Sequence, residues 1–132
     1  MTLRCTIVTP EKAVLDATID SVILPMIDGE LGVYPGREAL VGRLGPGELR
    51  LNHGTTTDHY FIDGGFAQVK QNLVTVLTAK AILVSALNAE KASQELVTAE
   101  ALPSTNELER EKKSKALALA HAQVRLTQKK YA

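Results

Sequence analysis

The chain has 132 residues, and because 45% are hydrophobic but only 4% aromatic, its core is expected to be aliphatic. A single cysteine excludes an internal disulfide, and no apolar run approaches the roughly 20 residues that a membrane-spanning helix needs. The net charge is zero, yet residues 104–132 contain seven Lys and Arg against three Glu, so this end carries +4 and suggests an acidic partner surface. The first part of the chain has no basic stripe and few aromatic residues, which disfavours nucleic-acid binding.

Short apolar and alternating segments predict strands through the first 80 residues, since successive side chains of a strand point to opposite faces. The segment 22–24 reads as a short buried strand that Pro25 ends. The segment 73–78 is apolar on both faces, so it is expected to lie between two layers. The other predicted strands include residues 3–7, 48–52 and 60–62.

Turns are predicted where residues that favour positive φ, or that fix φ, interrupt these strands. The predicted turn pairs are Asp28-Gly29, Pro35-Gly36, Pro46-Gly47, Gly64-Gly65 and Gln71-Asn72. Many short strands with frequent turns indicate an all-β sandwich or barrel rather than βαβ units.

The chain after residue 80 has no glycine, and its apolar residues follow helical spacing. A break at residues 102–106 offers good N-cap residues, so two helices in an antiparallel hairpin are expected. The two predicted seams are Ala89, Ala92, Leu96 and Ala99, and Leu117, Ala120 and Val124. Alanine buries little area, so the hairpin is expected to be weakly held and able to rearrange.

The residues give no indication of catalysis, a bound metal or a cofactor. None of the three histidines, His53, His59 and His121, has a second His or a Cys at metal-ligand spacing. The glycine-rich segments lack the Gly-Lys-Ser/Thr of a phosphate-binding loop, and they read as β-turns. A non-enzymatic, coupling or regulatory role is the expectation.

Four segments occur together in an order that resembles one family, the ε subunit of F-type ATP synthases (called δ in mitochondria). The segments are Val8-Thr9-Pro10-Glu11, Val22-Ile23-Leu24-Pro25, the twelve residues from Gly29-Glu30-Leu31-Gly32 to Leu40, and Gly64-Gly65-Phe66-Ala67-Gln68-Val69 with Asn72-Leu73-Val74-Thr75-Val76-Leu77. The resemblance covers essentially the whole chain.

This resemblance implies a ten-stranded β-sandwich over residues 1–82, followed by a two-helix hairpin over residues 83–132. The sandwich would bind the γ subunit and rest on the ring of c subunits, so that ion-driven rotation drives ATP synthesis. The hairpin would extend along γ, contact the catalytic subunits transiently and restrain ATP hydrolysis. The subunit would lie peripherally at the cytoplasmic face of the inner membrane, held through the synthase complex.

The resemblance also assigns candidate site residues. The rotor contact would be formed by Glu30, Tyr34, Pro35, Gly36 and Arg37. A regulatory basic face would comprise Arg110, Lys112, Lys113, Lys115, Arg125, Lys129 and Lys130, although the same charges also suit a solvated helix that places cations near its C-terminus.

Two departures from the family pattern bear on the contacts and on nucleotide binding. Arg37, Glu38 and Ala39 stand where the family usually has His-Ala-Pro, so the γ contacts at Arg37 are expected to differ. Some members bind ATP through a motif that here reads Asn88, Lys91 and Ala92, where Asn replaces Asp and Lys replaces Arg. Lysine lacks the planar fork of arginine, so weak ATP binding is expected. The alternative is a free-standing β-sandwich that binds a nucleotide.

Overall fold

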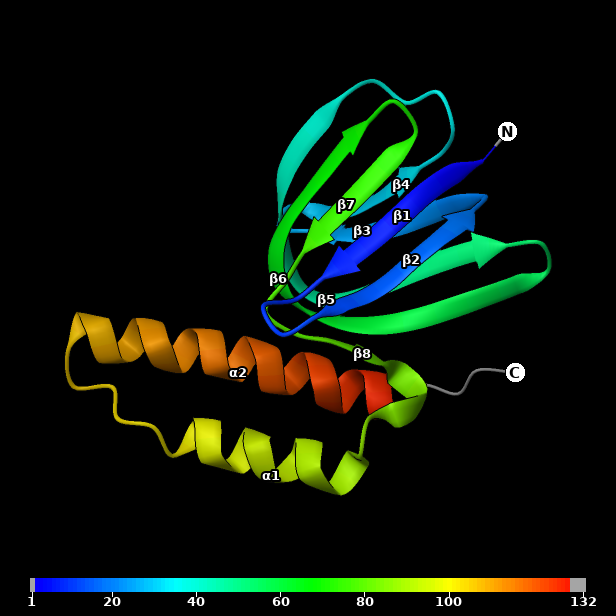
Figure 1. The fold of residues 1–132 in the computed structure, drawn as a ribbon. Helices are drawn as coiled ribbons and strands as arrows, with labels where there is room; N and C mark the ends of the chain where they lie inside the picture. Colours follow the sequence, from blue (N-terminus) through cyan, green and yellow to red (C-terminus); the bar gives the residue numbers. More distant parts are fainter. Residues whose placement is uncertain (1, 129–132) are drawn as a thin grey trace. The chain divides into compact units, whose positions relative to one another are not determined.

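The computed structural model describes residues 2–128 and divides the chain into two compact units, with the boundary between Leu83 and Val84 (Figure 1). The first unit holds the strands β1 (Leu3–Val8), β2 (Ala13–Ile19), β3 (Ser21–Met26), β4 (Gly29–Val33), β5 (Leu40–His53), β6 (Thr56–Lys70), β7 (Leu73–Leu77) and β8 (Ala81–Leu83). The second holds a short 3-10 helix, η1 (Val84–Ala86), and the helices α1 (Ala89–Glu100) and α2 (Glu107–Gln128).

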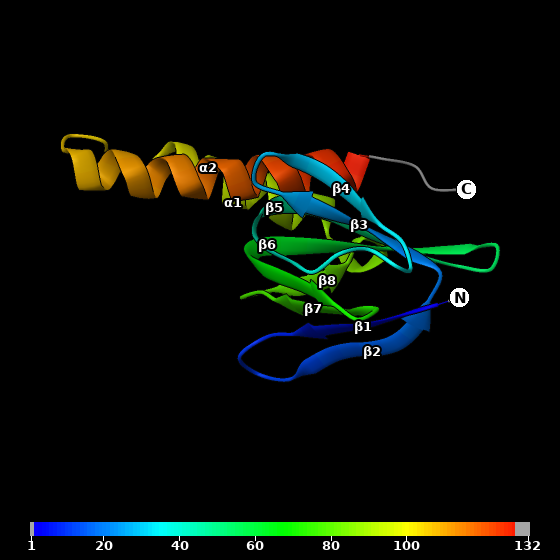
Figure 2. The same ribbon diagram turned by 90° about the horizontal axis from the view of Figure 1, so that it is seen from above.

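The strands form a two-layer sandwich in the order β2-β1-β7-β6-β5-β3-β4, with β8 paired to β6 (Figure 2). The second half of β6 pairs with β7, whereas its first half pairs with β8. β5 pairs with β6 along nearly its whole length, and the second half of β5 also pairs with β3. β5 and β6 therefore pass through both layers. The predicted sandwich is confirmed, with eight described strands rather than the expected ten; counting each half of β5 and β6 separately gives ten.

The prediction of turns at Pro46-Gly47 and Gly64-Gly65 is wrong, because both pairs lie inside long strands. They mark the bend at which β5 and β6 pass from one layer to the other, and the β5–β6 register skips a residue pair there. Gly64 and Gly65 have φ values of 66° and 115°, so the bend uses the same backbone freedom as a turn. The predicted turns at residues 35–36 and 71–72 are present. The turn predicted at residues 28–29 is shifted by one residue, because it covers Ile27 and Asp28 and Gly29 begins β4.

The core lies between the two layers and is mostly aliphatic, as the composition predicts, with Tyr60 as an aromatic member. Leu3, Cys5 and Ile7 of β1 all point into it and are at most 1% exposed. The prediction that Pro25 ends a strand is wrong, because β3 continues to Met26 and Pro25 pairs with Glu30 of β4. The proline is tolerated where the β3–β5 register is irregular, so no ladder bond to β5 is lost there.

The prediction that β7 is buried on both faces is also wrong. Val74 and Val76 are fully buried, but Leu73 and Leu77 on the opposite face are 39% and 51% exposed. An apolar side chain on the outer face of this mixed layer looks the same in sequence as one in the core, so period alone does not separate the two cases.

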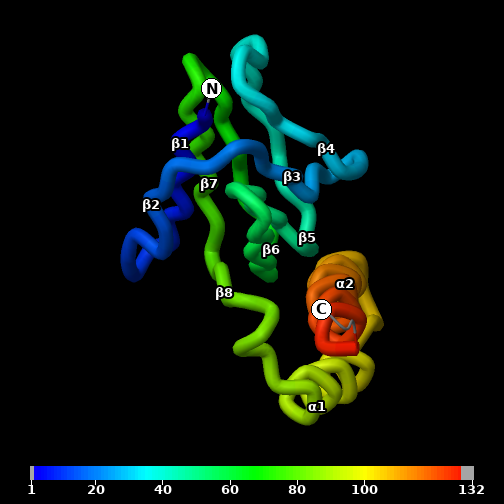
Figure 3. Tube along the Cα trace, turned by 90° about the vertical axis from the view of Figure 1, so that its right-hand side faces the viewer, coloured from blue at the N-terminus to red at the C-terminus, as the bar shows by residue number. Residues whose placement is uncertain are grey.

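In the second unit, α1 and α2 run side by side as a hairpin (Figure 3), which confirms the predicted helical hairpin. Ala92, Ala99 and Ala120 are buried, whereas the predicted seam residue Ala89 is exposed. Asn106 caps helix α2: its Oδ1 accepts a hydrogen bond from the Glu109 backbone N–H at 2.8 Å, and its Nδ2 donates to Glu109 Oε1 at 2.6 Å.

Candidate functional site

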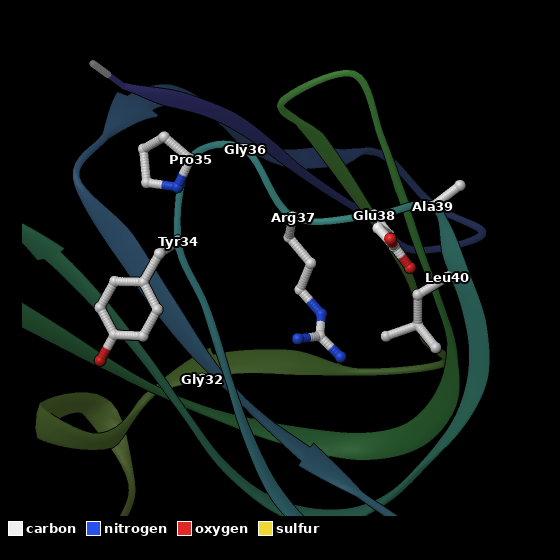
Figure 4. A pocket seen from close by; sticks show the side chains of 8 residues that line it. All are labelled: Gly32, Tyr34, Pro35, Gly36, Arg37, Glu38, Ala39 and Leu40. Atoms are coloured by element: carbon white, nitrogen blue, oxygen red, sulfur yellow. The ribbon is translucent and has the colours of Figure 1, made fainter.

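The loop after β4 encloses an open hollow of about 410 Å³ (Figure 4). Its lining consists of Gly32, Tyr34, Pro35, Gly36, Arg37, Glu38, Ala39 and Leu40. The structure thus brings together four of the five residues predicted for the rotor contact. The fifth, Glu30, lies on β4 and is not part of this lining.

Specific backbone contacts fix the shape of this loop. Arg37 N–H donates to the Tyr34 carbonyl at 3.3 Å, and Gly36 N–H donates to Asn72 Oδ1 at 2.8 Å, which ties the loop to the β6–β7 turn. Gly36 has φ of 87°, a conformation that suits glycine. A Cβ at Gly32 would lie 3.2 Å from the Tyr34 ring, so the glycine leaves room for the aromatic side chain. The loop presents an exposed aromatic and an exposed guanidinium on a defined backbone.

Glu30 belongs to a network of polar and charged side chains on the layer that contains β3 and β4, called the second layer below. Arg50 Nη2 lies 3.1 Å from Glu30 Oε2, and Arg50 Nη1 lies 2.9 Å from Glu48 Oε1. His59 Nδ1 lies 3.3 Å from Glu48 Oε2. Burial lowers the pKa of Arg50, but hydrogen bonds and attraction to Glu48 and Glu30 outweigh it and raise that pKa overall. Arg50 therefore stays charged.

Sequence reasoning missed Arg50, Glu48 and His59. Glu48 and Arg50 are two residues apart on β5, so they share a face, and this spacing was the only local signal. Their meeting with Glu30 depends on β3 and β4 pairing beside β5, which no local pattern predicts.

The five predicted basic residues that the structure describes lie on α2, but they do not form one face. Each residue of a helix turns by about 100°, so Lys112 and Arg125 point in directions about 140° apart. Lys113 is half-buried, and the others that the structure describes, Arg110, Lys112, Lys115 and Arg125, are exposed. The single basic face expected from the sequence is replaced by cations on several sides of the helix. Lys129 and Lys130 lie outside the described residues.

Asn88 of the degenerate ATP motif caps α1. Its Oδ1 accepts a hydrogen bond from the backbone N–H of Lys91 at 2.9 Å, which satisfies one of the free donors at the helix N-terminus. Ala92 is buried in the same helix. The local structure thus gives Asn88 a role in folding that needs no nucleotide.

Comparison with known proteins places these features in a family. Residues 2–84 match the family model described as ATP synthase, Delta/Epsilon chain, beta-sandwich domain. The chain is 46% identical over 125 residues to the ATP synthase epsilon chain of Rhodopirellula baltica, a match that covers 95% of this chain and 98% of that one.

The chain belongs to the ATP synthase delta/epsilon family. The resemblance inferred from the four sequence segments is confirmed, as is the assignment to a non-catalytic subunit of ATP synthase. A second delta/epsilon-type relative, the ATP synthase epsilon chain of Granulibacter bethesdensis, is 39% identical over 75% of this chain and 74% of its own.

Solved structures agree with this delta/epsilon fold. A chain of the Euglena gracilis mitochondrial ATP synthase, from a structure of OSCP/F1/c-ring, matches with a TM-score of 0.81 and 28% identity over 92% of this chain and 78% of that chain. A chain from the Tetrahymena thermophila synthase matches with a TM-score of 0.77 over 97% of this chain, and at 13% identity it supports the fold alone. Among residues 2–128, no helix of this family member is long and apolar enough to cross a membrane.

Proposed function

We propose that this chain is the central-stalk subunit of a rotary F-type ATP synthase and couples ion-driven rotation of the c-ring to ATP synthesis. The observation that carries the proposal is its 46% identity to an ATP synthase epsilon chain over nearly the full length of both chains. The Tetrahymena chain of the same fold comes from a structure described as central stalk/c-ring, which is consistent with this role.

The proposed partners are the γ subunit and the c-ring, and the subunit lies at the cytoplasmic face of the inner membrane through the complex. Glu30 of β4 and the loop residues Tyr34, Pro35, Gly36 and Arg37 form the rotor contact. Support comes from its geometry: the loop is fixed by the Asn72 hydrogen bond, and it exposes Tyr34 and Arg37 beside a hollow. A rigid loop loses little conformational entropy when it binds, so it suits a permanent contact.

The test of this contact is the charge reversal Glu30→Lys in synthase reconstituted into vesicles. A membrane-potential dye reports ion pumping for either proton or sodium coupling, and ATP hydrolysis is measured in parallel. We expect less pumping per ATP hydrolysed, because the variant turns an acid at the contact into a base. Glu11→Lys, the same change at another exposed acid of the sandwich, serves as the control. Equal pumping ratios for both variants and the parent would remove Glu30 from the contact.

We further propose that the hairpin restrains ATP hydrolysis through transient contact with the catalytic subunits. Three of its buried side chains, Ala92, Ala99 and Ala120, are small, so each exposes little apolar surface when the hairpin opens, whereas Leu126 of α2 is a larger buried side chain. Helix α2 carries cations on several sides, which suits a partner that surrounds the helix with acidic residues. Together these features allow a compact form and an extended form to differ by a small free energy.

The restraint is tested with one variant in which all the basic residues are replaced by glutamine at the same time: Arg110, Lys112, Lys113, Lys115, Arg125, Lys129 and Lys130. We expect faster ATP hydrolysis by the complex, whereas single replacements have little effect because one exposed ion pair contributes about 0–1 kcal/mol. Added salt should likewise accelerate the parent by screening. The control neutralises Glu107 and Glu111 of the same helix. An unchanged rate in the multiple variant at low salt would refute the proposed restraint.

A further inference from the structure

Arg50 reaches across a neighbouring strand to hold a carboxylate at the edge of the sheet. In the second layer, β3 lies between β5 and β4, and Arg50 pairs in register with Ile23 of β3. Glu30 pairs with Pro25 on the other side of β3. Arg50 Nη2 nevertheless lies 3.2 Å from Oε1 and 3.1 Å from Oε2 of Glu30, so one nitrogen faces both oxygens of that carboxylate.

The other terminal nitrogen of the guanidinium, Nη1, is held by a buried residue of the same strand. Arg50 Nη1 donates to Glu48 Oε1 at 2.9 Å, and the Glu48 side chain is only 5% exposed. The Arg50 side chain is 25% exposed and that of Glu30 is 55% exposed. The inner pair is thus shielded from water, whereas the outer pair is open to solvent and to a partner. A shielded ion pair breaks less readily than an exposed one, because water and salt screen it less.

We propose that Arg50 is a positioning residue, which holds the Glu30 carboxylate in the orientation that the rotor partner binds. This rests on the proposed contact at Glu30. A free glutamate side chain must lose rotamer freedom on binding, and an anchored one has lost it beforehand. Glu48 in turn fixes Arg50, and the planar guanidinium contacts both carboxylates at once through separate nitrogens.

The experiment measures the dissociation constant between the full-length subunit and synthase depleted of it, for four proteins: the parent, Glu30→Gln, Arg50→Lys and the double variant. Lysine keeps the charge beside Glu48 but lacks the fork that reaches two carboxylates. We expect Arg50→Lys to raise the dissociation constant by about fivefold, the upper range for one exposed ion pair. In the Glu30→Gln background, Arg50→Lys should have no further effect.

Two controls separate positioning from a loss of structure. Arg4→Lys changes a different arginine–carboxylate pair of the sandwich, in which Arg4 Nε and Nη2 lie 2.9 Å and 2.7 Å from the Asp16 oxygens, and it should leave binding unchanged. Urea unfolding of each variant reports its stability. If Arg50→Lys fails to fold, the variant Glu48→Gln is used in its place. The glutamine amide oxygen can still accept a hydrogen bond from Arg50, but the negative charge that fixes Arg50 is gone.

The outcomes distinguish this inference from the proposed function. If Glu30→Gln binds like the parent, the contact assigned to Glu30 fails, and the positioning role fails with it. If Glu30→Gln weakens binding but Arg50→Lys is silent, the contact stands and the positioning role is overturned. The same holds if Arg50→Lys weakens binding equally in both backgrounds, because Arg50 would then act independently of Glu30.

Discussion

Replacing Gly65 with alanine tests the bend that carries β6 from one layer to the other. Gly65 has φ of 115°, and an added Cβ would overlap the Leu77 carbonyl oxygen and lie 3.0 Å from both the Leu77 carbonyl carbon and Thr78 Cα. Gly29 is a matched control, because its φ is 131° but nothing lies within 4 Å of an added Cβ. Both substitutions incur backbone strain, on the order of 1–3 kcal/mol. Only Gly65→Ala also forces β7 away from β6.

The extra cost can be estimated from the ladder between these strands. Phe66 pairs with Leu77 beside the bend, and separating them weakens one or two hydrogen bonds, each contributing about 1 kcal/mol. Gly65→Ala should therefore be about 2 kcal/mol less stable than Gly29→Ala. The free energy of unfolding falls by about 1–3 kcal/mol per molar urea. In urea unfolding of the full chain, the midpoint of Gly65→Ala should therefore lie about 1 M below that of Gly29→Ala. Equal midpoints for the two variants would refute the idea that close packing against β7, rather than φ alone, requires glycine at this position.

Three further predictions concern the helices and the core. Asn106→Ala removes the N-cap hydrogen bond to the Glu109 N–H and should lower the free energy of unfolding by about 1 kcal/mol; an unchanged thermal midpoint would contradict it. Burial, with a smaller contribution from Asp16, raises the pKa of Cys5 from 9.0 to about 12, so iodoacetamide should label it only as fast as the chain unfolds. Since the unfolded thiol ionises first, stability should decline from about pH 9 to 12, and Cys5→Ala should lack this decline. ATP should bind weakly, because Asn88 caps a helix and Lys91 offers no fork; a micromolar dissociation constant by titration calorimetry would disprove this.

Local patterns predicted the parts of the fold that local chemistry decides. The Asn106 cap and the glycine-free segment after residue 80 were enough to place two helices, and the alternation of Leu3, Cys5 and Ile7 was enough to orient β1. The pair Gly64-Gly65 gave a wrong prediction of a turn, because a turn between strands and a bend within one strand require the same positive φ. Only the long-range pairing of β6 with both β7 and β8 separates these two cases.

The candidate site shows the same division. The loop residues Tyr34 to Arg37 are contiguous in sequence, so their gathering around one hollow followed from the chain itself. Arg50 and Glu30 are 20 residues apart and meet only because β3 lies between their strands. The resemblance predicts one basic face, whereas helical geometry disperses the described basic residues around the axis of α2.

The two strands that pass through both layers also determine how the sandwich bears a mechanical load. In a sandwich whose layers are joined only by loops, a sideways force on one layer is resisted by side chains sliding over one another. Here β5 and β6 enter both layers as uninterrupted, mutually paired strands, so such a force is carried by covalent backbone and by the ladder between them. A torque applied at one layer therefore reaches the other through the backbone of these strands, and the bend at Gly64 and Gly65 lies on the path that carries it.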